Sequence, residues 1–143
     1  MDSSWEKISQ VIWTKGDAEI ALEYIDSLNN SLYGLDNKSF ESVAEKLPEE
    51  RISQTIIAEI RNVPEDLRRN YLRELVEAVK TSETMKLTVA VRLSRETIGE
   101  IVDELRGKWE KIIVEIEVNP EIVGGAMISW RGKFWEKTLY DKI

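Results

Sequence analysis

Histidine and cysteine are both absent from this chain of 143 residues. Their absence excludes a thiol nucleophile, a Ser–His or Cys–His relay, and the usual zinc and haem ligands. Disulfide bonds are excluded too, so a reducing compartment is the default expectation. The chain has 27 acidic and 20 basic side chains, a formal net charge of −7. This balance argues against nucleic acid as the main partner, because affinity for phosphates comes largely from Lys and Arg.

Long hydrophobic runs are also missing from the sequence. No apolar run approaches the roughly 20 residues that a membrane helix needs. The N-terminal sequence MDSSWEKISQ lacks the basic and apolar regions of a signal peptide, so we expect a location inside the cell. No acidic loop has the spacing of an EF-hand, and we expect neither a metal nor a cofactor.

The hydrophobic period changes near Thr84. Before it, apolar residues recur every three or four positions, which is typical of amphipathic helices. Five helices are predicted, over residues 5–12, 17–32, 38–47, 48–60 and 64–79. Gly34 supplies a stop for the second helix, and Pro48 and Pro64 should open the fourth and fifth. The face of the fifth helix that should point inward carries Leu67, Tyr71, Leu75, Ala78 and Val79.

After Thr84 the apolar period falls to two, which is typical of half-buried strands. Strands are predicted over residues 85–93, 112–118, 126–130 and 134–135, with Arg131-Gly132 as a turn. A helix capped by Ser94 and ended by Gly107 lies between the first two strands. We therefore predict an α+β fold, in which an antiparallel helical bundle (residues 1–84) precedes a small β-α-β-β-β sheet domain (residues 85–143).

The net charge belongs to the helical half. Residues 1–84 hold 17 acidic and 10 basic side chains, whereas residues 85–143 hold 10 of each. Two interpretations are open: an ordinary solvated helix surface, or an electrostatic docking face for a basic partner segment.

Candidate catalytic groups are few. Glu115 and Glu117 share one face of a predicted strand, as a glycosidase pair would, but alternating glutamates are also typical of a solvent face. Gly124-Gly125 lacks the GK[ST] of a phosphate-binding loop. A local basic cluster of Arg106, Lys108 and Lys111 keeps nucleic-acid binding open as a weaker alternative.

Residues 87–143 resemble the C-terminal domain of the delta subunit of F-type ATP synthase, the counterpart of the mitochondrial oligomycin sensitivity-conferring protein. Three pieces carry the resemblance in order: the strand-to-helix passage over residues 89–96, the run over residues 114–125, and the hairpin over residues 128–133. The second piece is the most specific, with an alternating strand, Asn119-Pro120, and Gly124-Gly125 after further apolar residues. The family has Asp at position 119, and its closing motif is altered here at Lys137-Thr138, Tyr140 and Ile143.

The resemblance implies a connector without an active site. In the family, a six-helix bundle binds the amphipathic N-terminal helices of the alpha subunits, and the C-terminal domain meets the end of the stalk b subunit. The chain would then join the catalytic alpha/beta head to the peripheral stalk, resist torque, and lie in the cytoplasm at the inner (plasma) membrane as part of a hetero-oligomer. The bundle residues that we expect at the alpha subunit are Trp5, Ile8, Ile12 and Trp13. On this interpretation Trp13→Asp weakens that contact and leaves the fold intact.

Two other classes of protein remain open from the residues alone. One is an unrelated intracellular adaptor or regulatory module, because a fold does not fix a function. The other is an enzyme that uses Asp, Glu, Lys or Tyr, which would need a deep pocket converging on Glu115 or Glu117.

Overall fold

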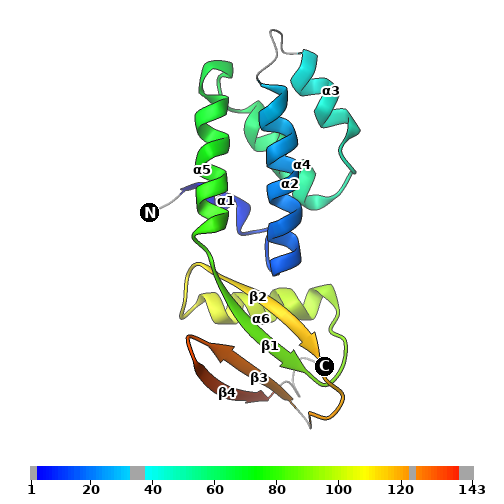
Figure 1. Cartoon of the computed structure of the whole chain (residues 1–143), viewed down its shortest axis with the longest axis vertical. Coiled ribbons are helices and arrows are strands. Elements are labelled where there is room, and N and C mark those ends of the chain that lie inside the picture. The colour runs from blue at the N-terminus through cyan, green and yellow to red at the C-terminus, as the bar shows by residue number, and fades with distance from the viewer. Residues whose placement is uncertain (1–2, 33–37, 123–124, 139–143) are drawn as a thin grey trace. The chain divides into compact units, whose positions relative to one another are not determined.

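Figure 1 shows the protein as a computed structural model, which describes residues 3–32, 38–122 and 125–138. The chain mixes helices and strands, as predicted, and it divides into two units. The helical unit holds Met1–Ile12 and Gly16–Thr81, and the C-terminal unit holds Trp13–Lys15 and Ser82–Ile143. The boundary predicted after residue 84 falls inside the first strand, because that strand begins at Glu83.

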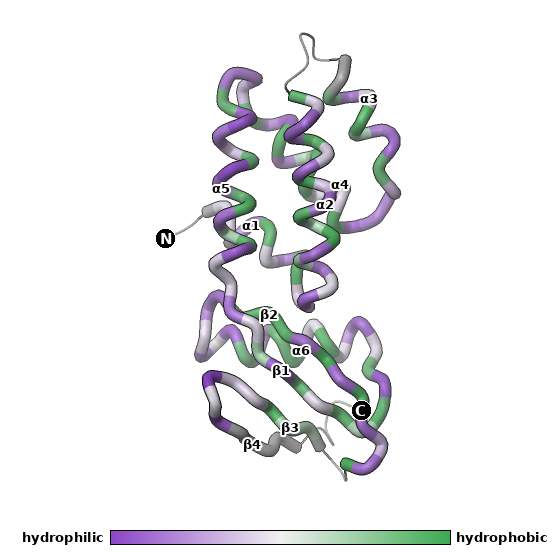
Figure 2. Tube along the Cα trace, viewed as in Figure 1, coloured by the Kyte–Doolittle hydropathy of each residue, from purple (hydrophilic) through white to green (hydrophobic). Residues whose placement is uncertain are grey.

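The described part of the helical unit has five α-helices, at the places that the apolar period predicts. They are α1 (Ser3–Ile8), α2 (Lys15–Ser31), α3 (Lys38–Lys46), α4 (Arg51–Arg61) and α5 (Arg68–Lys80). A 3-10 turn, η1 (Glu65–Leu67), precedes α5. In Figure 2 the tube of α5 alternates between hydrophilic and hydrophobic stretches, as an amphipathic helix should. The predicted stop at Gly34 lies outside the described residues.

The starts of α4 and α5 lie later than their prolines suggest. The backbone N–H of Glu50 donates to the hydroxyl of Ser53 at 3.2 Å, and α4 begins at the next residue, Arg51. Pro64 opens the 3-10 turn and not the α-helix itself. Leu67 closes that turn and is 49% exposed, so its predicted inward position is wrong. The buried position near the start of α5 is taken by Leu72.

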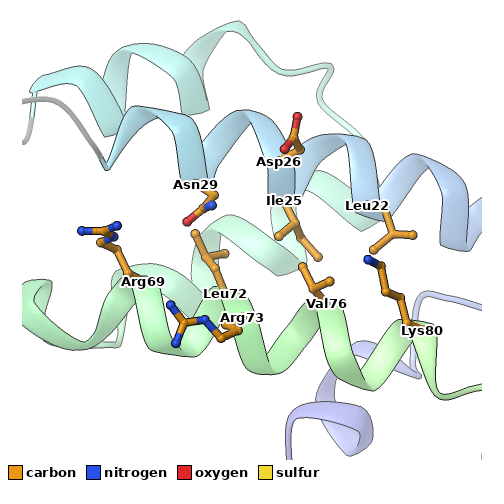
Figure 3. A pocket seen from close by; sticks show the side chains of 9 residues that line it. All are labelled: Leu22, Ile25, Asp26, Asn29, Arg69, Leu72, Arg73, Val76 and Lys80. Carbon is orange, nitrogen blue, oxygen red and sulfur yellow. The ribbon is translucent and has the colours of Figure 1, made fainter.

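The core of the helical unit is built from the apolar faces of its helices. Isoleucine, leucine and aromatic side chains make up most of it, and the largest are Trp5, Ile8, Ile12, Ile25, Leu28, Phe40, Ile56, Ile60, Leu72 and Leu75. Helix α5 packs against both α1 and α4. It also runs beside α2 in the opposite direction, as Figure 3 shows.

The C-terminal unit is a four-stranded sheet with one helix, and its element order is the predicted β-α-β-β-β. The elements are β1 (Glu83–Val89), α6 (Arg95–Arg106), β2 (Ile112–Val118), β3 (Gly125–Trp130) and β4 (Lys133–Thr138). The strands lie in the order β2-β1-β3-β4, with β1 and β2 parallel and the other pairs antiparallel. Arg131 and Gly132 have φ angles of 52° and 76°, as a tight hairpin turn requires.

Helix α6 covers one face of this sheet. The Ser94 hydroxyl accepts the N–H of Thr97 at 3.1 Å and caps the helix, and Gly107 ends it, as predicted. The shared core takes residues from α6 and three strands: Met85, Leu87, Val89, Ile101, Val102, Leu105, Ile112, Val114, Ala126, Ile128 and Trp130.

The first strand is shorter than its alternating sequence predicts. The strand was expected to reach Leu93, but the last pair of the β1–β2 ladder joins Val89 to Val118. There the N–H of Asn119 donates to the carbonyl of Val89 at 2.7 Å, and the parallel pairing stops. Beyond this point Val91 lies outside the β1–β2 ladder and is 50% exposed.

Candidate partner-binding site

The four residues predicted to bind the alpha subunit are divided between the two units. Trp5, Ile8 and Ile12 are 3%, 2% and 0% exposed, within the core of the helical unit. Helix α1 ends at Ile8, and the hydroxyl of Ser9 donates to the carbonyl of Glu6 at 3.1 Å, a bond that competes with further helix. A partner would reach these three side chains only if α1 and the residues that follow it moved out of the core. Their role in binding stays a prediction.

Trp13 lies outside α1 and belongs to the C-terminal unit. Its carbonyl accepts the N–H of Val114 at 2.9 Å, and its ring packs against the core beneath α6. The guanidinium of Arg95 lies 4.2 Å from the centroid of the ring, within the range of a cation–π contact. Trp13 is therefore half-buried by its own unit, and the helical period that placed it beside Ile12 does not apply.

A different site emerges between α2 and α5, where a groove of about 310 Å³ opens along both helices (Figure 3). Its floor is apolar and its rims are charged. The residues that line it are Leu22, Ile25, Asp26 and Asn29 from α2, and Arg69, Leu72, Arg73, Val76 and Lys80 from α5. Ile25 and Leu72 are fully buried, whereas Leu22 and Val76 are half-exposed and offer apolar surface to a ligand.

The shape of the groove suits a rod better than a small molecule. The lining residues of α5 run from Arg69 to Lys80, about 16 Å at the rise of an α-helix. The volume is near the lower end of the range of small-molecule pockets, which is about 300–1,000 Å³. A groove between two helices with apolar side chains at its base can receive the apolar face of an amphipathic helix.

Sequence reasoning did not single out this groove. The groove depends on two helices that are far apart in the sequence, so no local motif marks it. A signal was nevertheless present in α5, where Arg69, Arg73 and Lys80 lie within roughly 40° of one another on the helix surface. Cations beside an apolar stripe are common on amphipathic surface helices, so this row alone does not identify a binding face.

Asn119 makes two hydrogen bonds in the turn after β2. The side-chain carbonyl of Asn119 accepts the N–H of Glu121 at 3.0 Å, and its backbone carbonyl accepts the N–H of Ile122 at 3.1 Å. The carboxylate of an Asp at this position could accept the same bond, so the change to Asn keeps the turn. Pro120 follows in that turn, Gly125 opens β3, and Gly124 lies outside the described residues.

The two glutamates considered for catalysis do not form a reactive site. Glu115 and Glu117 are both exposed and lie outside the groove. Glu117 pairs with Lys86 at 2.8 Å, and Glu115 lies 3.9 Å from Lys15. Within the described ranges, no group of three or more acidic residues is placed to hold a metal ion.

The basic cluster considered for nucleic acid is partly engaged inside the C-terminal unit. The Nε of Arg106 donates to the carbonyl of Ile112 at 2.9 Å, which ties the end of α6 to β2. Burial lowers the pKa of Arg106 to about 10. The ammonium of Lys108 lies 6.0 Å from the ring centroid of Trp109. These contacts give the cluster a structural use.

Polar contacts at Glu59 join three helices of the helical unit. Its carboxylate lies 3.2 Å from the ammonium of Lys7 on α1 and accepts the hydroxyl of Tyr71 on α5 at 3.3 Å. Burial and the charge of Glu59 raise the pKa of Tyr71 to about 12. The neutral phenol is therefore favoured in the folded protein.

This raised pKa predicts how stability depends on alkaline pH. Tyr71 is neutral in both states below pH 10, and above that pH the unfolded state ionises first. The free energy of unfolding should therefore fall as pH rises from 10 to about 12. We expect Tyr71→Phe to remove on the order of 1 kcal/mol of this fall, because the half-exposed ring is screened by water. Urea unfolding of both proteins across this range measures the difference, and parallel pH profiles would contradict it.

No helix within the described ranges is long and apolar enough to span a membrane. The family model of the ATP synthase delta (OSCP) subunit matches residues 37–143, which is most of the chain. The match takes in α3, α4, α5 and all the strands, and it leaves α1 and α2 outside. A search of curated proteins finds no match.

Proposed function

This chain belongs to the ATP synthase delta (OSCP) subunit family, and from that premise we propose that it links the catalytic alpha/beta head to the peripheral stalk and resists the torque of rotation. A member of this family is a structural subunit and not an enzyme. It is part of the stator and works in a hetero-oligomer with other subunits of the synthase. The match therefore argues against both an enzyme and an unrelated adaptor.

We propose that the two domains, residues 1–84 and 85–143, bind different subunits of the synthase. The first acts as an antiparallel bundle that binds the N-terminal helices of the alpha subunits, and the second meets the C-terminus of the stalk b subunit. The complex would lie on the cytoplasmic side of the inner (plasma) membrane. The family match and the groove between α2 and α5 support this assignment.

The groove is the main evidence that the helical domain binds the alpha subunit, because its apolar floor can receive a helix. Leu22 and Val76 contribute to it from opposite walls, and in Figure 3 Val76 lies opposite Ile25 and Leu22 lies near Lys80. Burying the exposed parts of two such side chains contributes roughly 1–3 kcal/mol to binding. Trp5, Ile8, Ile12 and Trp13 remain as the alternative contact for the same helix.

Val76→Asp tests the groove. A charge on the floor should weaken binding of a synthetic peptide of the alpha-subunit N-terminus at least about tenfold, because the docked helix would remove water from the carboxylate and would lose the apolar surface of Val76. Isothermal titration calorimetry measures the affinity, and circular dichroism checks that the half-exposed position tolerates the change. Val91→Asp is the matched control, since it makes the same substitution at an exposed site of the C-terminal unit. Equal affinity of Val76→Asp and wild type would remove the groove from the proposal.

A pull-down with purified alpha and b subunits tests the linking function itself. We expect the full chain to retain both subunits at the same time, since each domain is assigned one of them. Retention of neither subunit would contradict the proposed function, whatever the groove binds.

A further inference from the structure

The two walls of the α2–α5 groove differ in charge. The wall from α5 carries Arg69, Arg73 and Lys80, all of them exposed. The wall from α2 carries Asp26, whose carboxylate points away from α5 in Figure 3. A ligand in the groove would therefore lie beside three cationic side chains along one rim, whereas the one carboxylate of the other wall points away from α5.

The sign of this rim is opposite to that of the whole chain. The protein carries a formal net charge of −7, and all of it falls in residues 1–84. The Debye length at physiological salt is about 8 Å, so a docked helix feels mainly the charges beside it. The rim of α5 therefore determines the charge preference, and the general acidity of the helical unit does not.

The spacing of the cations fits one edge of a helix. Arg69, Arg73 and Lys80 are four and seven residues apart, and they form a nearly straight row along α5. Acidic residues spaced four and seven apart on a neighbouring helix form a matching row. Leu22 and Val76 border the same groove and would cover the apolar stripe of such a helix.

We propose that the groove selects an amphipathic helix whose edge over α5 is acidic. This inference rests on the proposed function and specifies the partner: the N-terminal helix of the alpha subunit contributes an apolar stripe and an edge of Glu or Asp residues. A basic docking segment, which the overall charge suggests, is the alternative that the experiment must separate.

Two model peptides make the test independent of the natural partner. Both are amphipathic helices with the same leucine stripe and one neutral edge, and the other edge carries either Glu or Lys at spacings of four and seven. Titrated at low salt into the full chain, the Glu-edged peptide should bind several-fold more tightly, although the protein repels it overall. High salt should reduce the preference, because screening weakens exposed ion pairs.

Charge reversals in the protein test whether the cations of α5 cause the preference for the Glu-edged peptide. The double variant Arg73→Glu/Lys80→Glu should bind the Glu-edged peptide about tenfold more weakly, as expected for several exposed ion pairs replaced by repulsions. Its affinity for the Lys-edged peptide should not fall. Lys46→Glu reverses an exposed charge on α3, outside the groove, and should change neither affinity by more than about twofold.

Binding of the alpha-subunit peptide distinguishes a failure of the charge inference from a failure of the proposed function. If wild type binds it and the double variant binds it equally well, the charge inference is overturned and the proposed function stands. If wild type does not bind it, the proposed function fails at this contact, and the model peptides then show whether the groove still selects an acidic edge. Equal binding of both model peptides to wild type would also overturn the inference.

Discussion

Replacing Phe40 by alanine should unfold α3 and lower the free energy of unfolding by about 3–5 kcal/mol. Phe40 is 1% exposed, and in α3 the other described apolar side chains are smaller or half-exposed. The guanidinium of Arg68 lies 5.0 Å from the centroid of its ring, so the substitution also removes a cation–π contact. The loss should exceed that of other changes on this helix.

The length of α3 explains why the effect should be local. It has nine residues, fewer than the roughly 12–15 that an isolated helix needs in water. Its order therefore depends on packing through Phe40 and Ala44. The exposed ion pair between Glu41 and Arg61, at 2.7 Å, adds little by comparison.

Hydrogen exchange distinguishes this loss from a general one. In Phe40→Ala the amides of α3 should lose protection, and those of α6 should keep it because they belong to the other unit. Val43→Ala is the matched control, since it shortens a half-exposed side chain of the same helix and should cost about 1 kcal/mol or less. Unchanged protection of α3 in Phe40→Ala would show that another contact holds this helix.

The helices and strands follow from local periodicity, and so the sequence predicts them well. The three- and four-residue stripes predict the five helices before Thr81, and Ser94 and Gly107 bound α6. Where periodicity continues past the end of an element, the prediction fails. Val91 keeps the alternation of β1, but a strand ends where its neighbour ends, and the sequence of one strand does not contain that information.

The candidate site is less predictable, because it depends on contacts between distant segments. The aromatic and apolar side chains of Trp5, Ile8 and Ile12 suggest a docking face. The same kinds of side chain also form a core, and in the structure all three are buried there. The net charge of residues 1–84 suggests a basic partner, but a sum over a domain hides a local row of cations. Only the pairing of α2 with α5 shows that Arg69, Arg73 and Lys80 border an apolar groove.

Trp13→Ala should destabilise the C-terminal unit by about 3 kcal/mol, near the lower end of the range for buried aromatic residues, because the ring is half-buried. The ring packs on α6 at Gly99, and a Cβ placed on that glycine would lie 2.8 Å from the Cη2 atom of Trp13. Glycine inside a helix costs about 1 kcal/mol relative to alanine, and the tryptophan ring explains why it is needed here. This expectation replaces the sequence-based one, that substituting Trp13 leaves the fold intact.

A second substitution tests whether the two residues act as a pair. Gly99→Leu alone should cost about 1–3 kcal/mol, because the leucine displaces the ring. In Trp13→Ala/Gly99→Leu the leucine can enter the space that the ring leaves, so the double variant should lose less stability than the sum of the single variants. Ile98→Ala is the control, since it shortens a partly buried side chain next to Gly99 on the same helix and creates no space-filling group for the ring to meet. Combined with Trp13→Ala, it should give an additive loss in thermal unfolding and in the exchange of α6 amides. Additive losses for the Gly99 pair as well would mean that the ring stabilises the unit through its contacts with Arg95 and the core, and not through its fit against Gly99.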